Sequence, residues 1–167
     1  MGRRFRSEYW QKVDGKGRVS IPANFRRVLE TCDPDWVEGK AANLVIVFGD
    51  TRRQFLEGYT MEELAEIDEK ISRIPRGTPQ RAYMQKLFYT LSEELSVDHT
   101  GRLVLPKTLR QKLRLDGEGE VVFAGCGGTF QIWNPQDYEA QNAVQDGAAF
   151  EGLPEDADPL LILEQFN

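Results

Sequence analysis

The sequence predicts an α+β, β-rich fold in which two duplicated β-β-α-β-β halves form one pseudo-symmetric barrel, with a helical hairpin between the halves. Three features predict this fold: a gapless internal repeat, short strand-like runs after each copy of the repeat, and helical periodicity between the copies. A chain of 167 residues with 40% hydrophobic residues is long enough to bury the core of such a barrel. Its composition is that of a globular protein and excludes global disorder.

The internal repeat aligns residues 13–29 with residues 97–113. Seven of the 17 aligned pairs are identical, whereas average residue usage would give about one. The identical pairs are Val13/Val97, Asp14/Asp98, Gly17/Gly101, Arg18/Arg102, Pro22/Pro106, Arg26/Arg110 and Leu29/Leu113. Chance is a poor explanation for this agreement, so we infer a duplication.

Each copy is expected to begin with a β-hairpin. In the first copy a strand ends at Val13, the chain turns over residues 14–17, and a second strand reaches Ile21. Glycine at positions 17 and 101 supplies the positive φ that a tight turn requires, and the preceding aspartate favours turn initiation. The four residues Asp14, Gly17, Asp98 and Gly101 are therefore assigned a structural role in the turns.

A short helix and two further strands complete each copy. Pro22 and Pro106 suit the first position of a helix, where a missing N–H costs nothing. Apolar residues at helical spacing follow them, and strand-like runs come next at 44–48 and 121–124, then at 55–56 and 130–133. The alignment slips by nine residues along these runs, which predicts an insertion in loop 31–43. Because one copy has too few strands to close alone, the two copies are expected to share one barrel without free edges.

The residues between the copies predict a helical hairpin packed on the barrel. Thr60 and Glu63 form a capping-box pattern, and the helix that they start is expected to stop near Pro75. A second helix is expected from Thr78, with an apolar stripe that reaches Leu91. The predicted organisation is a first repeat at 5–58, a helical linker at 59–92, a second repeat at 93–140, and an acidic, disordered tail at 146–167.

Charge is distributed unevenly along the chain. Residues 1–30 carry eight Lys/Arg against three acids, whereas residues 141–167 carry six acids and no Lys or Arg. The basic segment 1–30 is expected to attract anionic ligands, although the formal net charge of the whole chain is −6. Pairing the two hairpins is expected to bring their basic residues close to the basic N-terminal run. The candidate DNA-binding residues are Lys16, Arg18, Arg102, Arg3, Arg4, Arg6 and Lys12.

These residue types suit duplex DNA. Arginine can bond bidentately to O6 and N7 of guanine in the major groove, which admits a two-stranded ribbon, whereas lysine more often contacts phosphate. The alternative for Asp14/Arg18 and Asp98/Arg102 is a structural ion pair that closes each hairpin. Both roles can coexist, because an aspartate that orients its arginine also pre-organises the donor fork.

Neither an enzyme nor a metal site is expected. The glycine-rich segment 124–129 has no Gly-Lys-Ser/Thr after it, and His99 is the only imidazole that could activate Cys126. We interpret the segment as a turn between strands, with no cofactor. No stretch approaches the roughly 20 apolar residues of a membrane span, and the first ten residues lack the apolar core of a signal peptide. A cytoplasmic location without membrane association is therefore expected.

The two motifs, VDGKGRVSIP at 13–22 and VDHTGRLVLP at 97–106, resemble the paired signatures of the MraZ family, within the AbrB-like swapped-hairpin fold. The resemblance covers about residues 5–140. It implies a nucleoid-associated bacterial transcriptional regulator that oligomerises into a ring. It also implies binding to repeated boxes upstream of the cell-division and cell-wall gene cluster.

In the family the turn residues contact DNA, and the matching positions are Lys16, Arg18 and Arg102. The second copy departs from the first, because His99 and Thr100 stand where the first has glycine and lysine. Unequal contributions from the two halves are therefore expected. If one protomer neutralises about three phosphates, the log–log salt slope is only about −3, so several protomers must bind together.

An alternative hypothesis keeps the predicted fold but assigns the protein a different function. The chain would then be an antitoxin-like or scaffold interaction module whose acidic C-terminal tail docks a protein partner through residues 160–163 and Phe166. Deletion of residues 147–167 separates the two hypotheses. DNA binding that survives the deletion while a protein partner is lost would make the tail a separate function.

Overall fold

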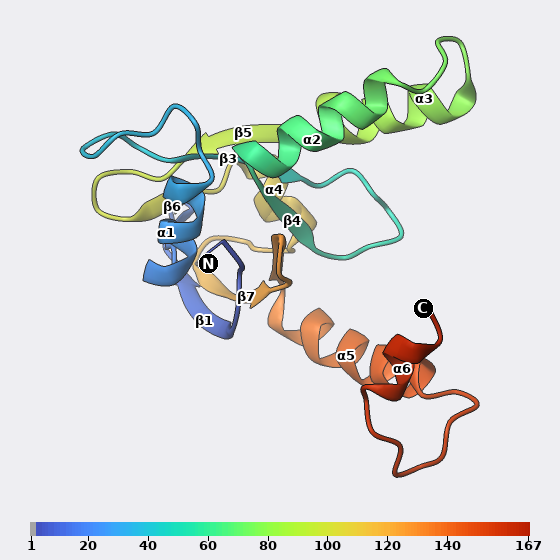
Figure 1. Cartoon of the computed structure of the whole chain (residues 1–167). Helices are drawn as coiled ribbons and strands as arrows, with labels where there is room; N and C mark the ends of the chain where they lie inside the picture. Colours follow the sequence, from blue (N-terminus) through green and yellow to red (C-terminus); the bar gives the residue numbers. More distant parts are fainter. Residues whose placement is uncertain (1–2) are drawn as a thin grey trace. The chain divides into compact units, whose positions relative to one another are not determined.

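The computed structural model describes residues 3–167. It divides the chain into a first unit, which extends to Asn134, and a second unit from Pro135 to Asn167 (Figure 1). The first unit holds all eight β-strands. The strands are β1 (Glu8–Val13), β2 (Arg18–Ser20), β3 (Asn43–Val47), β4 (Leu56–Thr60), β5 (Ser92–Ser96), β6 (Arg102–Val104), β7 (Gly119–Gly125) and β8 (Thr129–Trp133).

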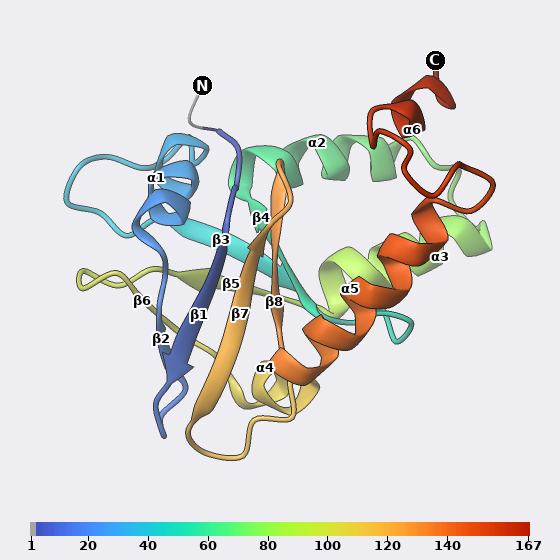
Figure 2. The ribbon, with the colours of Figure 1, turned by 90° about the horizontal axis from the view of Figure 1, so that it is seen from below.

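The strands form one antiparallel sheet in the order β5-β3-β4-β8-β7-β1-β2-β6 (Figure 2). The two end strands, β5 and β6, follow each other in the chain and meet at the second turn. There the Asp98 N–H donates to the Arg102 carbonyl (2.8 Å), just as the Asp14 N–H donates to the Arg18 carbonyl (3.0 Å) in the first hairpin. The sheet therefore closes on itself as a nearly complete barrel, and the predicted β-rich α+β fold is confirmed.

The two copies exchange strands. The register of β1 along β7 runs from Glu8↔Ala124 to Val13↔Gly119, so the first strand of one copy lies beside the third strand of the other. The reciprocal pair is β5 with β3, and the second strands, β2 and β6, pair with each other between the copies. Each half thus completes its part of the sheet only with strands from its counterpart, which is the swapped-hairpin arrangement.

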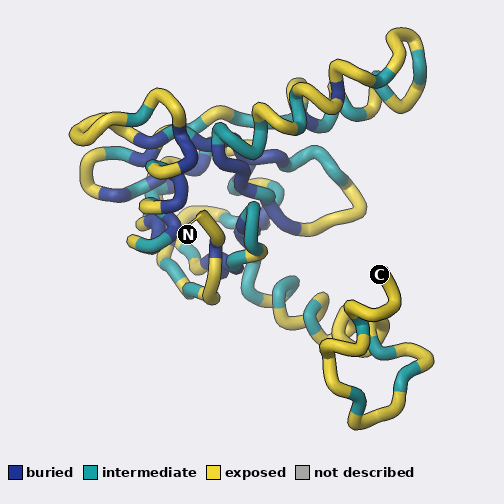
Figure 3. The backbone as a smooth tube through the Cα atoms, in the orientation of Figure 1, coloured by how far each residue is buried: buried dark blue, intermediate teal, exposed yellow. Residues whose placement is uncertain are grey.

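The shared core contains residues from both copies. Phe25 lies within 5.1 to 6.2 Å of the ring centroids of Phe5, Tyr9, Phe123 and Phe130. Figure 3 shows buried residues concentrated along the strands. Helices α1 (Ala23–Thr31) and α4 (Lys107–Lys112) add their apolar faces to this core. Both helices begin one residue later than expected, because the prolines before them keep an extended ψ and cap the helix from outside.

Two linker helices and a π-helix join the copies. The N-caps are as the sequence predicts: Thr60 Oγ1 accepts from the Glu63 N–H (3.0 Å) in α2 (Met61–Ser72), and Thr78 Oγ1 accepts from the Arg81 N–H (3.2 Å) in α3 (Pro79–Gln85). The second helix does not stay α-helical to Leu91, because residues Lys86–Thr90 form a π-helix, η1. This wider turn buries Phe88 against Tyr59, 5.5 Å between ring centroids, in a second apolar cluster.

The length difference between the copies is shared by two loops. Loop 32–42 is longer than its counterpart 113–118, as expected, but loop 48–55 is also longer than its counterpart 126–128. The sequence alignment places all of the insertion in the first loop, and that assignment is wrong. Sequence similarity cannot divide an insertion between two exposed loops, whereas strand register can.

The second unit contains helix α5 (Pro135–Ala149) and the short helix α6 (Leu161–Glu164). Helix α5 crosses both boundaries set from sequence, the end of the second repeat at 140 and the start of the tail at 146. Pro135 suits a helix start, and the residues that follow include several good helix formers, so the helix continues although its last turn has no basic residue. Across residues 3–167 the structure contains no helix that is both long and apolar enough to cross a membrane.

Candidate nucleic-acid interface

Each hairpin turn is built around its aspartate. Asp14 Oδ1 accepts hydrogen bonds from the backbone N–H groups of Lys16 and Arg18, both 2.9 Å. Gly17 donates its N–H to the Asp14 carbonyl (3.0 Å) and has a φ of 83°. The second turn repeats this pattern with Asp98, Thr100, Arg102 and Gly101, whose φ is 80°. A side chain at either glycine would strain the turn.

Hydrogen bonds keep both aspartates ionised. The Thr100 hydroxyl donates to Asp98 Oδ1 (2.7 Å), and with the Arg102 N–H it lowers the pKa of Asp98 to about 2. The Arg18 backbone N–H and guanidinium likewise lower the pKa of Asp14. The stability that Asp98 contributes is therefore present above its ordinary pKa of 3.8 and is lost as the pH falls towards 2.

Replacing Thr100 by valine should raise the pKa of Asp98 part of the way from about 2 towards 3.8, because the largest cause of its lowering is removed. The measurement is an NMR titration of the side-chain carboxyl carbons. The pKa of Asp14, in the other turn, serves as the internal control and should not move. An unchanged Asp98 pKa would contradict the role assigned to the Thr100 hydroxyl.

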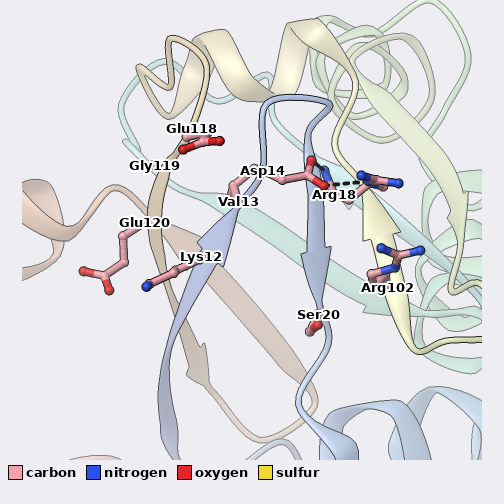
Figure 4. A pocket seen from close by; sticks show the side chains of 9 residues that line it. All are labelled: Lys12, Val13, Asp14, Arg18, Ser20, Arg102, Glu118, Gly119 and Glu120. Atoms are coloured by element: carbon pink, nitrogen blue, oxygen red, sulfur yellow. Dashed lines mark hydrogen bonds and ion pairs between the residues drawn. The ribbon is translucent and has the colours of Figure 1, made fainter.

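The two motif arginines lie on the outward face of adjacent strands. The register Arg18↔Val104 and Ser20↔Arg102 sets them diagonally across the β2–β6 pair, while the intervening Val19 and Leu103 are buried in the core. The side chains of Arg18 and Arg102 are 37% and 36% exposed. Figure 4 shows them on neighbouring strands, with Asp14 against Arg18. They therefore face solvent, where a ligand can reach them.

Each arginine is held by its Nε and leaves the end of its guanidinium available. Arg18 Nε donates to Asp14 Oδ2 (2.6 Å), whereas Arg102 Nε donates to Thr100 Oγ1 (2.9 Å) and lies 3.6 Å from Asp98 Oδ2. Within residues 3–167 neither arginine has a hydrogen bond from its Nη atoms to the chain. The structural ion pair and a free donor fork thus occur together, and each fork can engage a pair of acceptors.

An open hollow of about 760 Å³ lies beside these arginines. It is lined by Lys12, Val13, Asp14, Arg18, Ser20, Arg102, Glu118, Gly119 and Glu120 (Figure 4). Lys12 stands opposite Glu120 in the β1–β7 ladder, so one wall of the hollow carries acidic side chains. Ser20 and the two glutamates are not among the residues predicted from the sequence. The alternation of residues along β2 could have indicated Ser20, but the glutamates enter only through the strand exchange.

The N-terminal arginines lie elsewhere. Phe5 pairs with Gly127 in the β7–β8 turn, and Arg3 Nη1 lies 3.4 Å from Glu62 Oε1 at the start of α2. These residues precede β1, whose six residues span about 20 Å before the first hairpin turn. The expectation that Arg3, Arg4 and Arg6 lie near the turns is therefore wrong. Lys12, near the other end of β1, does lie in the hollow, and Lys16 is exposed in the turn itself.

The glycine-rich segment 124–129 forms the connection from β7 to β8. The Cys126 N–H donates to the Thr129 carbonyl (2.9 Å) and Gly127 has a φ of 82°. The segment leads from one strand into the next and not into a helix N-terminus, which phosphate-cradling loops require. Its interpretation as a turn between strands is confirmed.

Known proteins provide an independent comparison. The profile of the MraZ protein family, which is described as antitoxin-like, matches residues 88–156. The chain is 53% identical to a transcriptional regulator MraZ of Ruegeria sp. (strain TM1040) and 52% identical to that of Ruegeria pomeroyi, in each case over 98% of this chain and 97% of the relative. It is 39% identical to the transcriptional regulator MraZ of Rhodospirillum rubrum over 87% of this chain and 88% of the relative.

The names of these relatives are those of regulators and not of enzymes, in agreement with the sequence analysis. Such identity extends over both copies of the repeat and over the helical linker between them. It confirms the resemblance carried by the two hairpin motifs, and the chain belongs to the MraZ family.

Proposed function

We propose that this protein is a transcriptional regulator that binds duplex DNA sequence-specifically through the outward face of β2 and β6. One observation carries the proposal: Arg18 and Arg102 lie on adjacent strands, face solvent, and are held at Nε, while their Nη groups make no hydrogen bond to residues 3–167. This is a pre-organised pair of guanine readers on a two-stranded ribbon, the width of which suits the major groove. The names of the relatives support the regulatory role.

The spacing of the two arginines limits what one protomer can read. Diagonal neighbours on paired strands are about 7 Å apart, which is about two steps of 3.4 Å along one DNA strand. One protomer would then specify only a few base pairs. Useful affinity therefore needs several protomers that bind repeated boxes together, and we infer a homo-oligomeric ring in the cytoplasm, associated with the nucleoid. We further propose, as the family resemblance implies, that these boxes lie upstream of the cell-division and cell-wall gene cluster.

The experiment is a binding titration with the upstream region of the protein's own operon, run at several salt concentrations, beside light scattering for the mass of the assembly. The proposal predicts a multimer and a log–log salt slope steeper than the roughly −3 that one protomer supports. A monomer that binds promoter and scrambled DNA with equal affinity would contradict it.

Lys16→Ala should weaken binding more than His99→Ala. Lys16 is exposed in the first turn, where it can neutralise a phosphate, whereas the second turn has Thr100 at the equivalent position and no lysine. Losing one phosphate contact should flatten the salt slope by about 1 for each protomer bound, to a similar extent on every DNA sequence. Equal losses for the two variants in parallel titrations would show that the turns contribute equally.

A second candidate function uses the C-terminal residues. Leu160, Leu163 and Phe166 are 63–83% exposed beside several acidic residues, which suits docking of a protein partner. Deleting residues 150–167 removes this segment and leaves α5 whole. If regulation were lost while DNA binding in the titration stayed unchanged, the interaction module would be the better description.

A further inference from the structure

One of the seven identical residue pairs belongs neither to the hairpins nor to the buried core. The valine and leucine pairs are buried, the aspartate and glycine pairs shape the turns, the prolines precede the helices, and the hairpin arginines face outward. The remaining pair is Arg26 in α1 and Arg110 in α4. Because these two residues occupy equivalent positions in the copies, their contacts can be compared directly.

The side chain of each of these arginines packs against the turn glycine of the other copy. A Cβ placed on Gly17 would lie 3.2 Å from both Cδ and Nε of Arg110, and a Cβ placed on Gly101 would lie 2.5 Å from Nη1 of Arg26. Both glycines are buried although the residues just before them are exposed. The arginines therefore act as covers over the two turns, and each cover comes from the opposite half of the chain.

Backbone hydrogen bonds reinforce the same crosswise arrangement. The Leu105 N–H donates to the Gly17 carbonyl (2.8 Å), and the Ile21 N–H donates to the Gly101 carbonyl (2.9 Å). Leu105 and Ile21 come just before the helices that carry Arg110 and Arg26, respectively. Each turn is thus fixed from one side by the peptide before the opposite helix and from another by a side chain of that helix.

Neither arginine places its charge in an ion pair within the described residues 3–167. Arg110 Nε is buried and has no hydrogen-bond partner among these residues. A buried donor without a partner is unfavourable. Arginine at position 110 is explained despite this cost if the packing of its side chain against Gly17 stabilises the first turn.

We propose that Arg26 and Arg110 are positioning residues that act crosswise on the DNA-reading turns. Arg110 of the second copy holds the turn that carries Lys16 and Arg18, and Arg26 of the first copy holds the turn that carries Arg102. The inference rests on the proposed DNA-binding function. The position of each DNA-binding arginine would then depend on the helix of the other copy, so the two hairpins are structurally coupled.

Double-mutant cycles on DNA affinity test the pairing. Arg110→Ala should weaken specific binding about tenfold. The loss should be non-additive with Arg18→Ala, because both act on one turn, and additive with Arg102→Ala. Arg26→Ala should show the reverse pattern. Additivity in every cycle, or coupling of Arg26 with Arg18 of its own copy, would overturn the proposal.

Salt dependence separates positioning from direct contact with phosphate. A positioning residue should leave the log–log salt slope unchanged and reduce the discrimination between promoter and scrambled DNA. Loss of a phosphate contact would flatten the slope by about 1 for each protomer bound and weaken binding to both DNAs equally. The second result would replace the positioning role with a contact role.

A readout without DNA separates this inference from the proposed function. Arg110→Ala should speed hydrogen exchange at the amides of Gly17 and Arg18, which bond to Asp14, and leave those of Gly101 and Arg102 unchanged. Arg26→Ala should do the opposite. If Arg18→Ala left DNA binding intact, the proposed function would fail, yet the exchange pattern would still decide this inference.

Methionine gives the matched control. At position 110 it keeps apolar atoms at about the depth of Cδ and Nε without the charge, so Arg110→Met should retain slow exchange at Gly17 and most of the affinity. At position 26 the contact is made by Nη1, which methionine cannot reach, so Arg26→Met should behave like Arg26→Ala. An Arg110→Met variant as defective as Arg110→Ala would refute the packing role.

Discussion

Arg18→Ala should abolish the preference of the protein for its promoter over scrambled DNA while leaving the fold intact. The substitution removes a donor fork that faces solvent from β2 and is oriented by Asp14. A bidentate contact from arginine to guanine is worth about 1–3 kcal/mol of discrimination. In an assembly that uses several protomers the loss is repeated at each of them, so specific affinity should fall far more than tenfold.

The matched control removes the same charge at a remote position. Arg76 is exposed between α2 and α3, so Arg76→Ala should change promoter affinity only slightly. Both variants are compared by fluorescence anisotropy on promoter and scrambled duplexes, with circular dichroism to check the fold. If the Arg18→Ala variant still discriminated between promoter and scrambled DNA, β2 would not be part of the DNA interface, and the proposed binding surface would be wrong.

Phe25→Ala should give the largest loss of stability. The side chain of Phe25 is fully buried, and its ring contacts residues from both copies, Phe5 in the first and Phe123 and Phe130 in the second. Truncating a buried phenylalanine lowers the free energy of unfolding by about 3–5 kcal/mol. Because the core is shared, both halves should remain in one unfolding transition that shifts to lower denaturant.

Val37→Ala is the control for this prediction. Val37 is 56% exposed, so its replacement should change the free energy of unfolding by less than about 0.5 kcal/mol. Urea unfolding followed separately by tryptophan fluorescence and circular dichroism measures both variants. Two separated transitions in Phe25→Ala, one for each copy, would show that the halves fold independently and that the exchanged strands do not couple them.

The hairpins could be predicted from the sequence because residues close together in the chain determine each turn. The aspartate and glycine of each motif fix a turn within five residues, and the alternation Arg18, Val19, Ser20 tells which side chains face outward once one of them is known to be buried. The internal repeat then supplies the second hairpin without further argument. The turns, the outward arginines and the shared barrel follow from these few residues.

Other features depend on contacts between distant segments. Arg3 lies beside Glu62 at the start of α2, and only the strand exchange brings Glu120 opposite Lys12. The strand exchange likewise brings Arg110 against Gly17 and Arg26 against Gly101. The seven identical pairs include Arg26 and Arg110, but the spacing of these residues cannot tell which copy a side chain contacts.

Amide hydrogen exchange of the intact assembly, measured with and without a promoter duplex, locates the surface that DNA covers. We expect DNA-dependent protection confined to residues 14–20 and 98–104, the two turns with their outward strands. Protection in the α2–α3 linker or in residues 135–167, with both hairpins unchanged, would contradict it.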